Sequence, residues 1–307
     1  MNQRLAIIGI TGKKSGGAFA KKILQNIDEI KSRFPDGIKI IVRKTSSLDS
    51  IKELTPHCEL FYFDENDKAC LEKLLTEVDT AINIAGIHLS SEIARAAAKN
   101  KVRRLILIHT TGIYSKYKAA GAAYREIDAF VTQLCGIHRI SLTICRPTMI
   151  YGNVHDKNVV KFIRLVDRFK ITPVVKGARF KLQPVHYEDL AEAYYSVLIN
   201  EEKTAGKNYV LSGGQEIYLR DMLTVIGKNL GKKTRFISCP FRLAYTGAWI
   251  IYLLTFTKKD YREKVQRLCE DRVYSHTEAT EDFGYNPRSF EDGIVSEVKE
   301  YLALKNK

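Results

Sequence analysis

Several features that mark particular classes of protein are missing from this sequence. The six cysteines, at 58, 70, 135, 145, 239 and 269, form no CxxC pair, and most lie in apolar stretches that suit buried thiols. We therefore expect a reducing compartment, with neither a zinc site nor any other bound metal. No basic-then-apolar leader precedes the first apolar stretch, so we expect a cytoplasmic protein rather than an exported one.

Long hydrophobic runs are also missing, because no stretch approaches the roughly 20 apolar residues that span a bilayer. The nearest is LAYTGAWIIYLLTF at 243–256, which is followed by lysines and arginines between 258 and 264. We expect a buried helix of a substrate-binding domain here. The alternative is an interfacial helix, which would place the protein peripherally on a membrane.

Negative charge is scarce relative to positive charge. The chain has 49 Lys and Arg against 35 Asp and Glu, a formal net charge of +14. A basic chain can face nucleic acid, an acidic membrane or a small anionic substrate. The surplus is spread along the chain without a basic patch interleaved with aromatic residues, so we expect a small anionic substrate and no nucleic-acid partner.

The first half of the chain alternates short apolar runs with stretches of helical spacing. Strands that are apolar throughout, each followed by a helix, predict a parallel sheet covered on both faces. This is an α/β fold with a doubly wound parallel sheet of the Rossmann type, whose ligands lie beyond the carboxyl ends of the strands. The runs are LAIIGI (5–10), IKIIVRK (38–44), CELFYFD (58–64), TAINIAG (80–86), VRRLILIHTT (102–111) and LTICRPTMIYG (142–152).

The second half is less regular. Residues 153–182 are basic and show no clear strand or helix pattern. The pattern of strands and helices returns in PVHYEDLAEAYYSVLI (184–199) and KNYVLS (207–212). We therefore predict a dinucleotide-binding domain over 1–152 that is rejoined by about 184–212. Residues 153–183 and 213–307 form a smaller, substrate-binding cap.

The stretch GITGKKSGGAFA at 9–20 resembles two kinds of phosphate-binding loop. A nucleoside-triphosphatase loop needs glycine at position 7 and a hydroxyl residue at position 14, and the chain has Ile7 and Lys14 there. A dinucleotide loop needs a strand, a tight glycine turn and a helix whose first amides face the pyrophosphate. The second pattern fits, and it assigns cofactor contacts to Gly9, Thr11, Gly12, Lys13 and Gly16.

The ends of the next strands extend this prediction. The second strand ends in Arg43, where an NAD site usually offers a carboxylate, and a guanidinium suits a 2′-phosphate instead. We therefore predict NADP, with NAD as the alternative. Asp64 can accept a hydrogen bond from the adenine amino group, and Asn83, Ala85 and Gly86 let the backbone approach the cofactor.

Together these residues resemble the extended short-chain dehydrogenase/reductases, the NAD-dependent epimerase/dehydratase family. The likeness covers nearly the whole chain. It rests on GITG at 9–12, INIAG at 82–86, TTGIY at 110–114, and above all on RPTMIYG at 146–152 and PVHYEDLAEA at 184–193.

The resemblance implies a nicotinamide-dependent oxidoreductase that often acts on nucleotide sugars. It places Pro147 at the cofactor, and it implies catalysis by a Ser/Thr with a Tyr-x-x-x-Lys pair. Thr110 carries over as the hydroxyl residue. The glycine spacing TGxxxG departs from the TGxxG of the extended branch.

The catalytic pair departs more seriously. Tyr114 and Lys118 have the right mutual spacing but follow Thr110 too closely, whereas Tyr124 is better placed and has Asp128 at its i+4 position. Three alternatives remain open. Tyr114 or Tyr117 acts with Lys118; Tyr124 acts with Lys116 or Lys118; or the pair is lost, as in atypical members that act as sensors or assembly factors.

In the second half, Arg179 stands where family members often present arginine to a substrate diphosphate, and His186 is expected to form a wall near the nicotinamide end. The leading prediction is an NADP-binding oxidoreductase of the epimerase/dehydratase type with an anionic substrate, plausibly a nucleotide sugar. The rivals are a catalytically weak or inactive NADP-binding sensor or assembly factor, and a reductase of a lipidic or steroid-like substrate suggested by 243–256.

Overall fold

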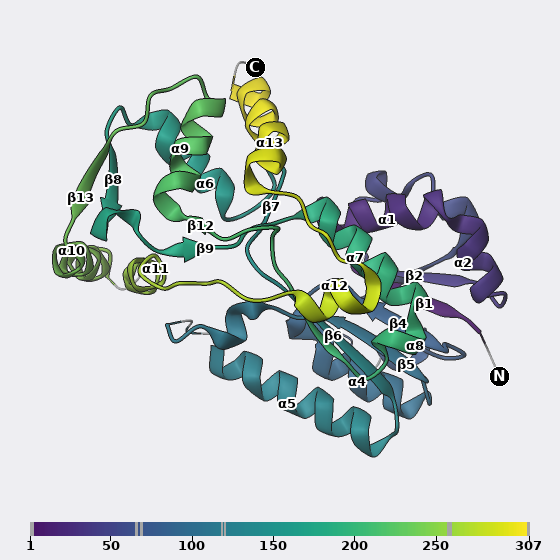
Figure 1. The fold of residues 1–307 in the computed structure, drawn as a ribbon. Helices are drawn as coiled ribbons and strands as arrows, with labels where there is room; N and C mark the ends of the chain where they lie inside the picture. The colour runs from purple at the N-terminus through teal and green to yellow at the C-terminus, as the bar shows by residue number, and fades with distance from the viewer. Residues whose placement is uncertain are drawn as a thin grey trace.

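A parallel seven-stranded sheet forms the centre of the molecule in the computed structural model, which describes residues 3–64, 67, 70–117, 119, 121–256 and 260–305 (Figure 1). Every neighbouring pair of strands is parallel. The order is β11-β6-β5-β4-β1-β2-β3, with bounds Asn208–Leu211, Ser141–Pro147, Arg104–Ile108, Thr80–Asn83, Leu5–Ile8, Ile38–Arg43 and Glu59–Phe63. The predicted doubly wound sheet is confirmed.

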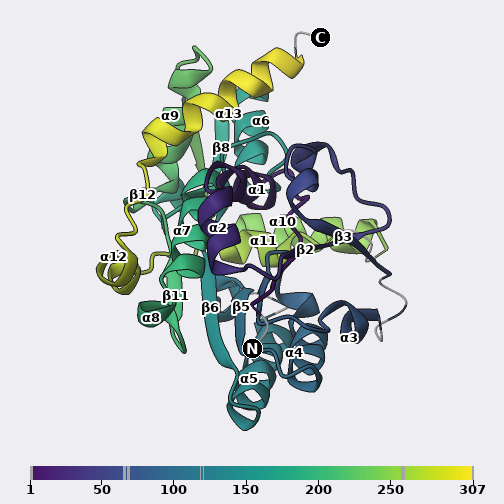
Figure 2. The same cartoon turned by 90° about the vertical axis from the view of Figure 1, so that its right-hand side faces the viewer.

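Helices cover both faces of this sheet, because its strands are apolar on both sides. One face packs against α1 (Ser15–Gln25), α2 (Ile27–Arg33), α7 (Tyr187–Ile199) and α12 (Thr277–Phe283). The other packs against α3 (Cys70–Leu74), α4 (Ser90–Lys99) and α5 (Gly121–Ile137). Figure 2 shows these two layers from the side. The strand β11 and helix α7 bring part of the second half back to the sheet.

A smaller cap lies beyond one end of the sheet, around a separate hydrophobic cluster (Figure 1). Its helices are α6 (Val159–Arg168), α9 (Leu219–Asn229), α10 (Phe241–Leu254), α11 (Arg262–Arg267) and α13 (Phe290–Lys305). Three strand pairs complete it and join it to the sheet domain. They are β8 (Thr172–Val175) with β13 (Phe236–Cys239), β9 (Lys181–Leu182) with β12 (Ile217–Tyr218), and β7 (Ile150–Tyr151) with β10 (Val185–His186).

Short elements connect these layers. They are α8 (Glu201–Thr204) and five 3-10 turns, η1 (Asp49–Ile51), η2 (Thr55–His57), η3 (Ile87–Leu89), η4 (Thr111–Tyr114) and η5 (Lys176–Ala178). The turns η3 and η4 directly follow the carboxyl ends of β4 and β5, so they lie at the edge where a ligand is expected.

The helix α10 lies at the rim of the cap rather than in its core. Ala248 is its one buried residue, and most of its leucine and isoleucine side chains are exposed. The expectation of a buried helix over 243–256 is therefore wrong, because an apolar sequence does not by itself supply a surface to pack against. None of the helices in the described part of the chain is long and apolar enough to cross a bilayer.

Candidate functional site

The glycine turn after β1 is shaped by close backbone packing. Gly9 has φ of +85°, and a Cβ atom there would lie 2.3 Å from the backbone nitrogen of Ala85. Gly16 lies in the first turn of α1, where a Cβ atom would lie 2.6 Å from the carbonyl oxygen of Gly9. Both positions therefore require glycine, and the absence of side chains brings β1, α1 and the loop after β4 together at the sheet edge.

Asn83 orders the loop after β4. Its side-chain nitrogen donates to the carbonyl of Gly86 at 3.0 Å, and its oxygen accepts from the backbone N–H of Ala85 at 3.1 Å. Gly86 has φ of +109°, a conformation that favours glycine. Asn83, Ala85 and Gly86, predicted to approach a cofactor, thus form one ordered turn beside Gly9.

Basic side chains gather at the end of β2. Arg43 is the last residue of the strand and is exposed, and the next residue, Lys44, forms an ion pair with Asp64 at 3.1 Å. The carboxylate predicted to bind adenine therefore already has a cationic partner. Arg43 and Lys44 give this edge of the sheet a positive charge.

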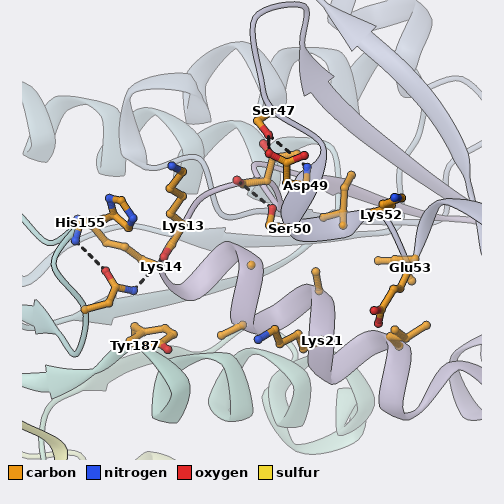
Figure 3. A pocket seen from close by; sticks show the side chains of 18 of the residues that line it. Lys13, Lys14, Lys21, Ser47, Asp49, Ser50, Lys52, Glu53, His155 and Tyr187 are labelled. Atoms are coloured by element: carbon orange, nitrogen blue, oxygen red, sulfur yellow. Dashed lines mark hydrogen bonds between the residues drawn. The ribbon is translucent and has the colours of Figure 1, made fainter. Parts of the chain in front are cut away.

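A cavity of about 800 Å³ lies beside the glycine turn, between α1 and the loop after β2 (Figure 3). Lysines line it at 13, 14, 21 and 52, together with the hydroxyl residues Ser47 and Ser50. Lys13 is held in place through its carbonyl oxygen, which accepts from Asn153 Nδ2 at 2.9 Å. Burial is the main cause that lowers the pKa of Lys14. Thr11 and Lys13, both predicted cofactor residues, face this cavity rather than the second one.

A second cavity, of about 190 Å³, lies where β5 and β6 end and the cap begins. Thr110, Thr111 and Thr148 form its wall on the sheet side, and Gln183 forms part of its wall on the cap side. Thr110 caps η4 by accepting from the N–H of Gly112 at 3.0 Å. Thr111 donates to the carbonyl of Pro147 at 3.2 Å, which places Pro147 behind this wall.

Two arginines from the cap line the same cavity. Arg267 and Arg272 each have a buried Nε without a hydrogen-bond partner among the described residues. Burial, and then the neighbouring Arg267 cation, lower the pKa of Arg272 to about 10. Two close guanidinium groups with unsatisfied donors suit a bound anion such as a diphosphate. The sequence did not single out these residues, because REKVQRLCEDR carries no motif.

Glu270 fastens the two walls of this cavity to each other. Its carboxylate accepts from Ser115 Oγ at 2.7 Å and from the backbone N–H of Lys116 at 2.8 Å. Tyr274, which also lines the cavity, packs against the ring of Tyr114 with 5.5 Å between centroids. The loop that carries Thr110 is thus held by the cap segment after α11.

The tyrosines that could move a proton lie at different depths. Tyr124 is buried in the first turn of α5, with its ring 5.5 Å from that of His88. Tyr114 and Tyr117 are about half exposed. Lys118, the lysine of the sequence's one Tyr-x-x-x-Lys near Thr110, lies outside the described residues.

Asp128 occupies the place one helical turn after Tyr124. Its carboxylate accepts two hydrogen bonds from Arg146 Nη2, both at 2.9 Å, and lies 2.9 Å from His109 Nδ1. His109 in turn contacts Ser90 at 3.1 Å. Asp128 is therefore part of an ion-pair network between α5 and β6, and Tyr124 has a carboxylate rather than a lysine at its i+4 position.

The two residues predicted to bind substrate lie elsewhere. Arg179 is exposed at the end of η5. His186 is buried between the rings of Tyr151 and Tyr187, at 5.3 and 4.8 Å, and caps α7 by accepting from the N–H of Glu188. Neither lines the second cavity, whereas Gln183, three residues before His186, does.

Comparisons with known proteins place this geometry in context. No family model matches the sequence. The chain is 21% identical over 334 residues to N-acetyl-alpha-D-glucosaminyl-diphospho-ditrans,octacis-undecaprenol 4-epimerase of Escherichia coli O157:H7, with 96% of this chain and 94% of that protein covered.

Solved structures resemble the chain over nearly its whole length. The protein gox2253 superposes with a TM-score of 0.76 at 18% identity, with 99% of each chain covered. The dTDP-glucose 4,6-dehydratase DesIV of Streptomyces venezuelae, solved with NAD and TYD, gives 0.72 at 17% identity, with 99% of this chain and 98% of that one covered. The UDP-glucuronic acid 4-epimerase of Bacillus cereus, solved with UDP-glucuronic acid and NAD, gives 0.69 at 14% identity, with 98% and 99% covered.

The chain has the fold of the NAD-dependent epimerases and dehydratases. The family resemblance that the sequence motifs indicated is confirmed at this level. The likeness extends over both the sheet domain and the cap, because 98–99% of the chain is covered. Within that fold the position of Asp128 is the feature of this chain that departs from the family's catalytic pair.

Proposed function

We propose that the chain is a nicotinamide-dependent oxidoreductase of the epimerase type, acting on a sugar carried by a diphosphate. The observation that carries this proposal is the second cavity. It combines Thr110, a hydroxyl at the end of a central strand, with the two cap arginines, whose buried Nε donors have no partner among the described residues. The curated relative is a diphospho-undecaprenol sugar epimerase, which supports the same substrate class.

The residues at the sheet edge fit a dinucleotide. The glycine turn leads directly from β1 into α1, so it sets the first amides of the helix at the sheet edge, where a pyrophosphate binds in such folds. When bound, the nicotinamide accepts or returns a hydride. Arg43 supports NADP as the cofactor, because it is an exposed arginine at the end of β2, where an NAD site usually offers a carboxylate, and NAD is the alternative.

In this proposal Arg267 and Arg272 hold the diphosphate and Thr110 holds the substrate oxygen that loses or gains a proton. Tyr124, or else Tyr114 or Tyr117, accepts and returns that proton. Gln183 contributes a further polar contact on the cap side of the cavity.

A second candidate function is a binding protein without turnover, favoured by Asp128. Its carboxylate stands where the resemblance implies a lysine, and it is engaged by Arg146 and His109. Tyr124 therefore has no lysine one turn away to lower the pKa of its hydroxyl. This chain would then bind the dinucleotide and the sugar diphosphate without interconverting them.

Three measurements separate these candidates. Fluorescence titration with NADPH and NADH tests the cofactor, and equal affinities or a preference for NADH in wild type would contradict the role of Arg43. Calorimetry measures the affinity for UDP-glucuronic acid and for UDP-N-acetylglucosamine. Arg272→Gln should bind these ligands more weakly than wild type, whereas Arg179→Gln, which changes an exposed arginine outside the cavity, should bind them as wild type does. Nuclear magnetic resonance of the sugar then detects epimerisation. Binding without conversion supports the second candidate, and no binding by wild type contradicts both.

A further inference from the structure

Most of the exposed side chains of α10 are apolar, and the polar ones are Arg242 and Thr246. Leu243, Trp249, Ile250 and Leu253 are each between 46% and 65% exposed, and Leu254 is 74% exposed. Phe256, just after the helix, is also exposed. Exposed apolar side chains that gather on one helix, rather than lying singly, mark an interaction surface.

Cations border this apolar face. Among the described residues of 240–268, four are Lys or Arg, at 242, 262, 264 and 267, against Asp260 and Glu263. Asp260 pairs with Arg262, and Glu263 pairs with Arg267, so both carboxylates are already engaged. Arg242 at the start of α10 and Lys264 on α11 are exposed, which leaves the border of the apolar face positive.

The size of α10 determines how it can meet a membrane. Its 14 residues make a helix of about 21 Å, which is shorter than the hydrocarbon core of a bilayer. A short helix with one apolar face and basic neighbours lies in the plane of the interface. Tryptophan and tyrosine favour the same depth, and α10 carries Trp249 on its exposed side and Tyr245 and Tyr252 half-buried.

We propose that α10 docks this protein on the surface of a bilayer that contains anionic lipids. The apolar face would enter the boundary between headgroups and acyl chains, and the basic border would meet the anionic headgroups. A second copy of the chain is a poorer occupant, because pairing two α10 faces would bring two positive borders together.

This surface adjoins the second cavity. The chain passes from α10 into α11, which ends at Arg267, and Arg267 lines that cavity. Docking would therefore bring the cavity near the lipid headgroups. The inference does not depend on the proposed function, since a membrane-docked chain without turnover would bind vesicles equally well.

The chain contains a natural probe for this surface, because Trp249 is its single tryptophan. The full chain would be mixed with phosphatidylcholine vesicles with and without phosphatidylglycerol. We expect the emission of Trp249 to move to shorter wavelength only with the anionic vesicles, and brominated acyl chains to quench it. Sedimentation of the same samples measures the bound fraction.

Two variants make the test specific. Ile250→Glu and Leu253→Glu should each weaken vesicle binding about tenfold, because each replaces an apolar side chain that docking would bury. Ile137→Glu is the matched control, because Ile137 is 67% exposed at the end of α5 in the sheet domain, and its binding should equal that of wild type.

Two outcomes would overturn the proposal. One is a tryptophan emission that is unchanged by anionic vesicles, together with a monomer mass in light scattering. The other is an emission shift that follows protein concentration without vesicles and accompanies a doubled mass, which would show that α10 pairs two copies of the chain.

Discussion

Arg146 on β6 and Asp128 on α5 form a two-oxygen ion pair, with Nη2 of the arginine 2.9 Å from each carboxylate oxygen. Burial acts to raise the pKa of Asp128, but the hydrogen bond from His109 and the charge of Arg146 outweigh it and lower that pKa. Burial lowers the pKa of His109 itself. The position one helical turn after Tyr124 is thus filled by a carboxylate that joins α5 to the central strand β6.

Removing this carboxylate should destabilise the fold. In Asp128→Ala the Arg146 cation stays largely buried without its partner, which typically costs about 3 kcal/mol or more of unfolding free energy. Glu192→Ala is the control, because it removes the more exposed ion pair with Lys22 and should cost about 1 kcal/mol or less. Urea unfolding measures both variants. Equal losses would mean that the buried pair contributes no more than a surface pair.

Replacing the hydroxyl of Thr110 should reduce turnover without unfolding the protein. Thr110→Ser keeps the hydroxyl and should keep most of the activity, whereas Thr110→Val should lower kcat by about 100-fold, because one positioned hydrogen-bond donor is lost. Valine also removes the hydrogen bond that the Thr110 hydroxyl accepts from the N–H of Gly112. The thermal unfolding of each variant must therefore be measured together with its kcat. A Thr110→Val enzyme with wild-type kcat would remove Thr110 from the mechanism.

The tyrosines can be separated by the same assay. If Tyr124 moves the proton, Tyr124→Phe should lower kcat by 100-fold or more while Tyr114→Phe leaves it within about threefold. The reverse result would assign the proton to Tyr114. Full activity in both variants and in Tyr117→Phe would exclude proton transfer by these three side chains.

Two glycines at the cofactor edge should respond differently to alanine. Both have positive φ, so each alanine should lose about 1 to 2 kcal/mol from backbone strain. Gly9→Ala should lose clearly more, because its Cβ atom would also meet the backbone of Ala85, whereas a Cβ atom on Gly86 meets nothing within 4 Å. Differential scanning calorimetry would compare the two, and equal losses would contradict the close packing at Gly9.

The carboxyl of Glu297 should make stability depend on pH above neutrality. Burial, and then the neighbouring Asp156, raise its pKa to about 9, so the folded state keeps a proton that the unfolded state releases above about pH 4.5. The resulting stabilisation is complete below pH 4.5 and is lost as the pH rises towards 9, by roughly 1.4 kcal/mol per pH unit at most.

Glu297→Gln tests this sign. Glutamine mimics the protonated acid, so the variant should lose less stability than wild type between pH 7 and 9 in urea unfolding. This window avoids His186, whose pKa is lowered to about 4, mainly by burial, and which destabilises the fold only as the pH falls below 6.5. Parallel pH profiles for wild type and variant would show that Glu297 is ionised in the folded state.

The sequence predicted the place in the fold of those candidate residues that lie at the ends of strands. Gly9, Asn83, Gly86 and Thr110 directly follow apolar runs, and parallel strands place such residues at one edge of the sheet. Arg267 and Arg272 could not be found this way, because they belong to an irregular segment that reaches the cavity only through tertiary packing.

The sequence also could not predict that α10 is exposed, because this depends on tertiary packing as well. An apolar helix is compatible with a protein core and with a membrane surface, and composition alone does not distinguish them. In the structure α10 packs against α11 and leaves Leu254 and its neighbours uncovered, which excludes a position in the core. The sequence showed Asp128 one helical turn after Tyr124, but it did not show the partners of Asp128, which are Arg146 on β6 and His109 just after β5.

The hydrogen bonds of Glu270 with Ser115 and Lys116 join the cap to the loop after β5, so the second cavity depends on both parts of the chain. The walls of the second cavity are drawn from Thr110 at one extreme to Tyr274 at the other. A fragment limited to residues 1–152 would contain the glycine turn and Thr110 but only half of the cavity. Under the proposed function, the glycine turn would thus bind its ligand with residues that are close in the sequence, whereas the second cavity draws on residues from 110 to 274.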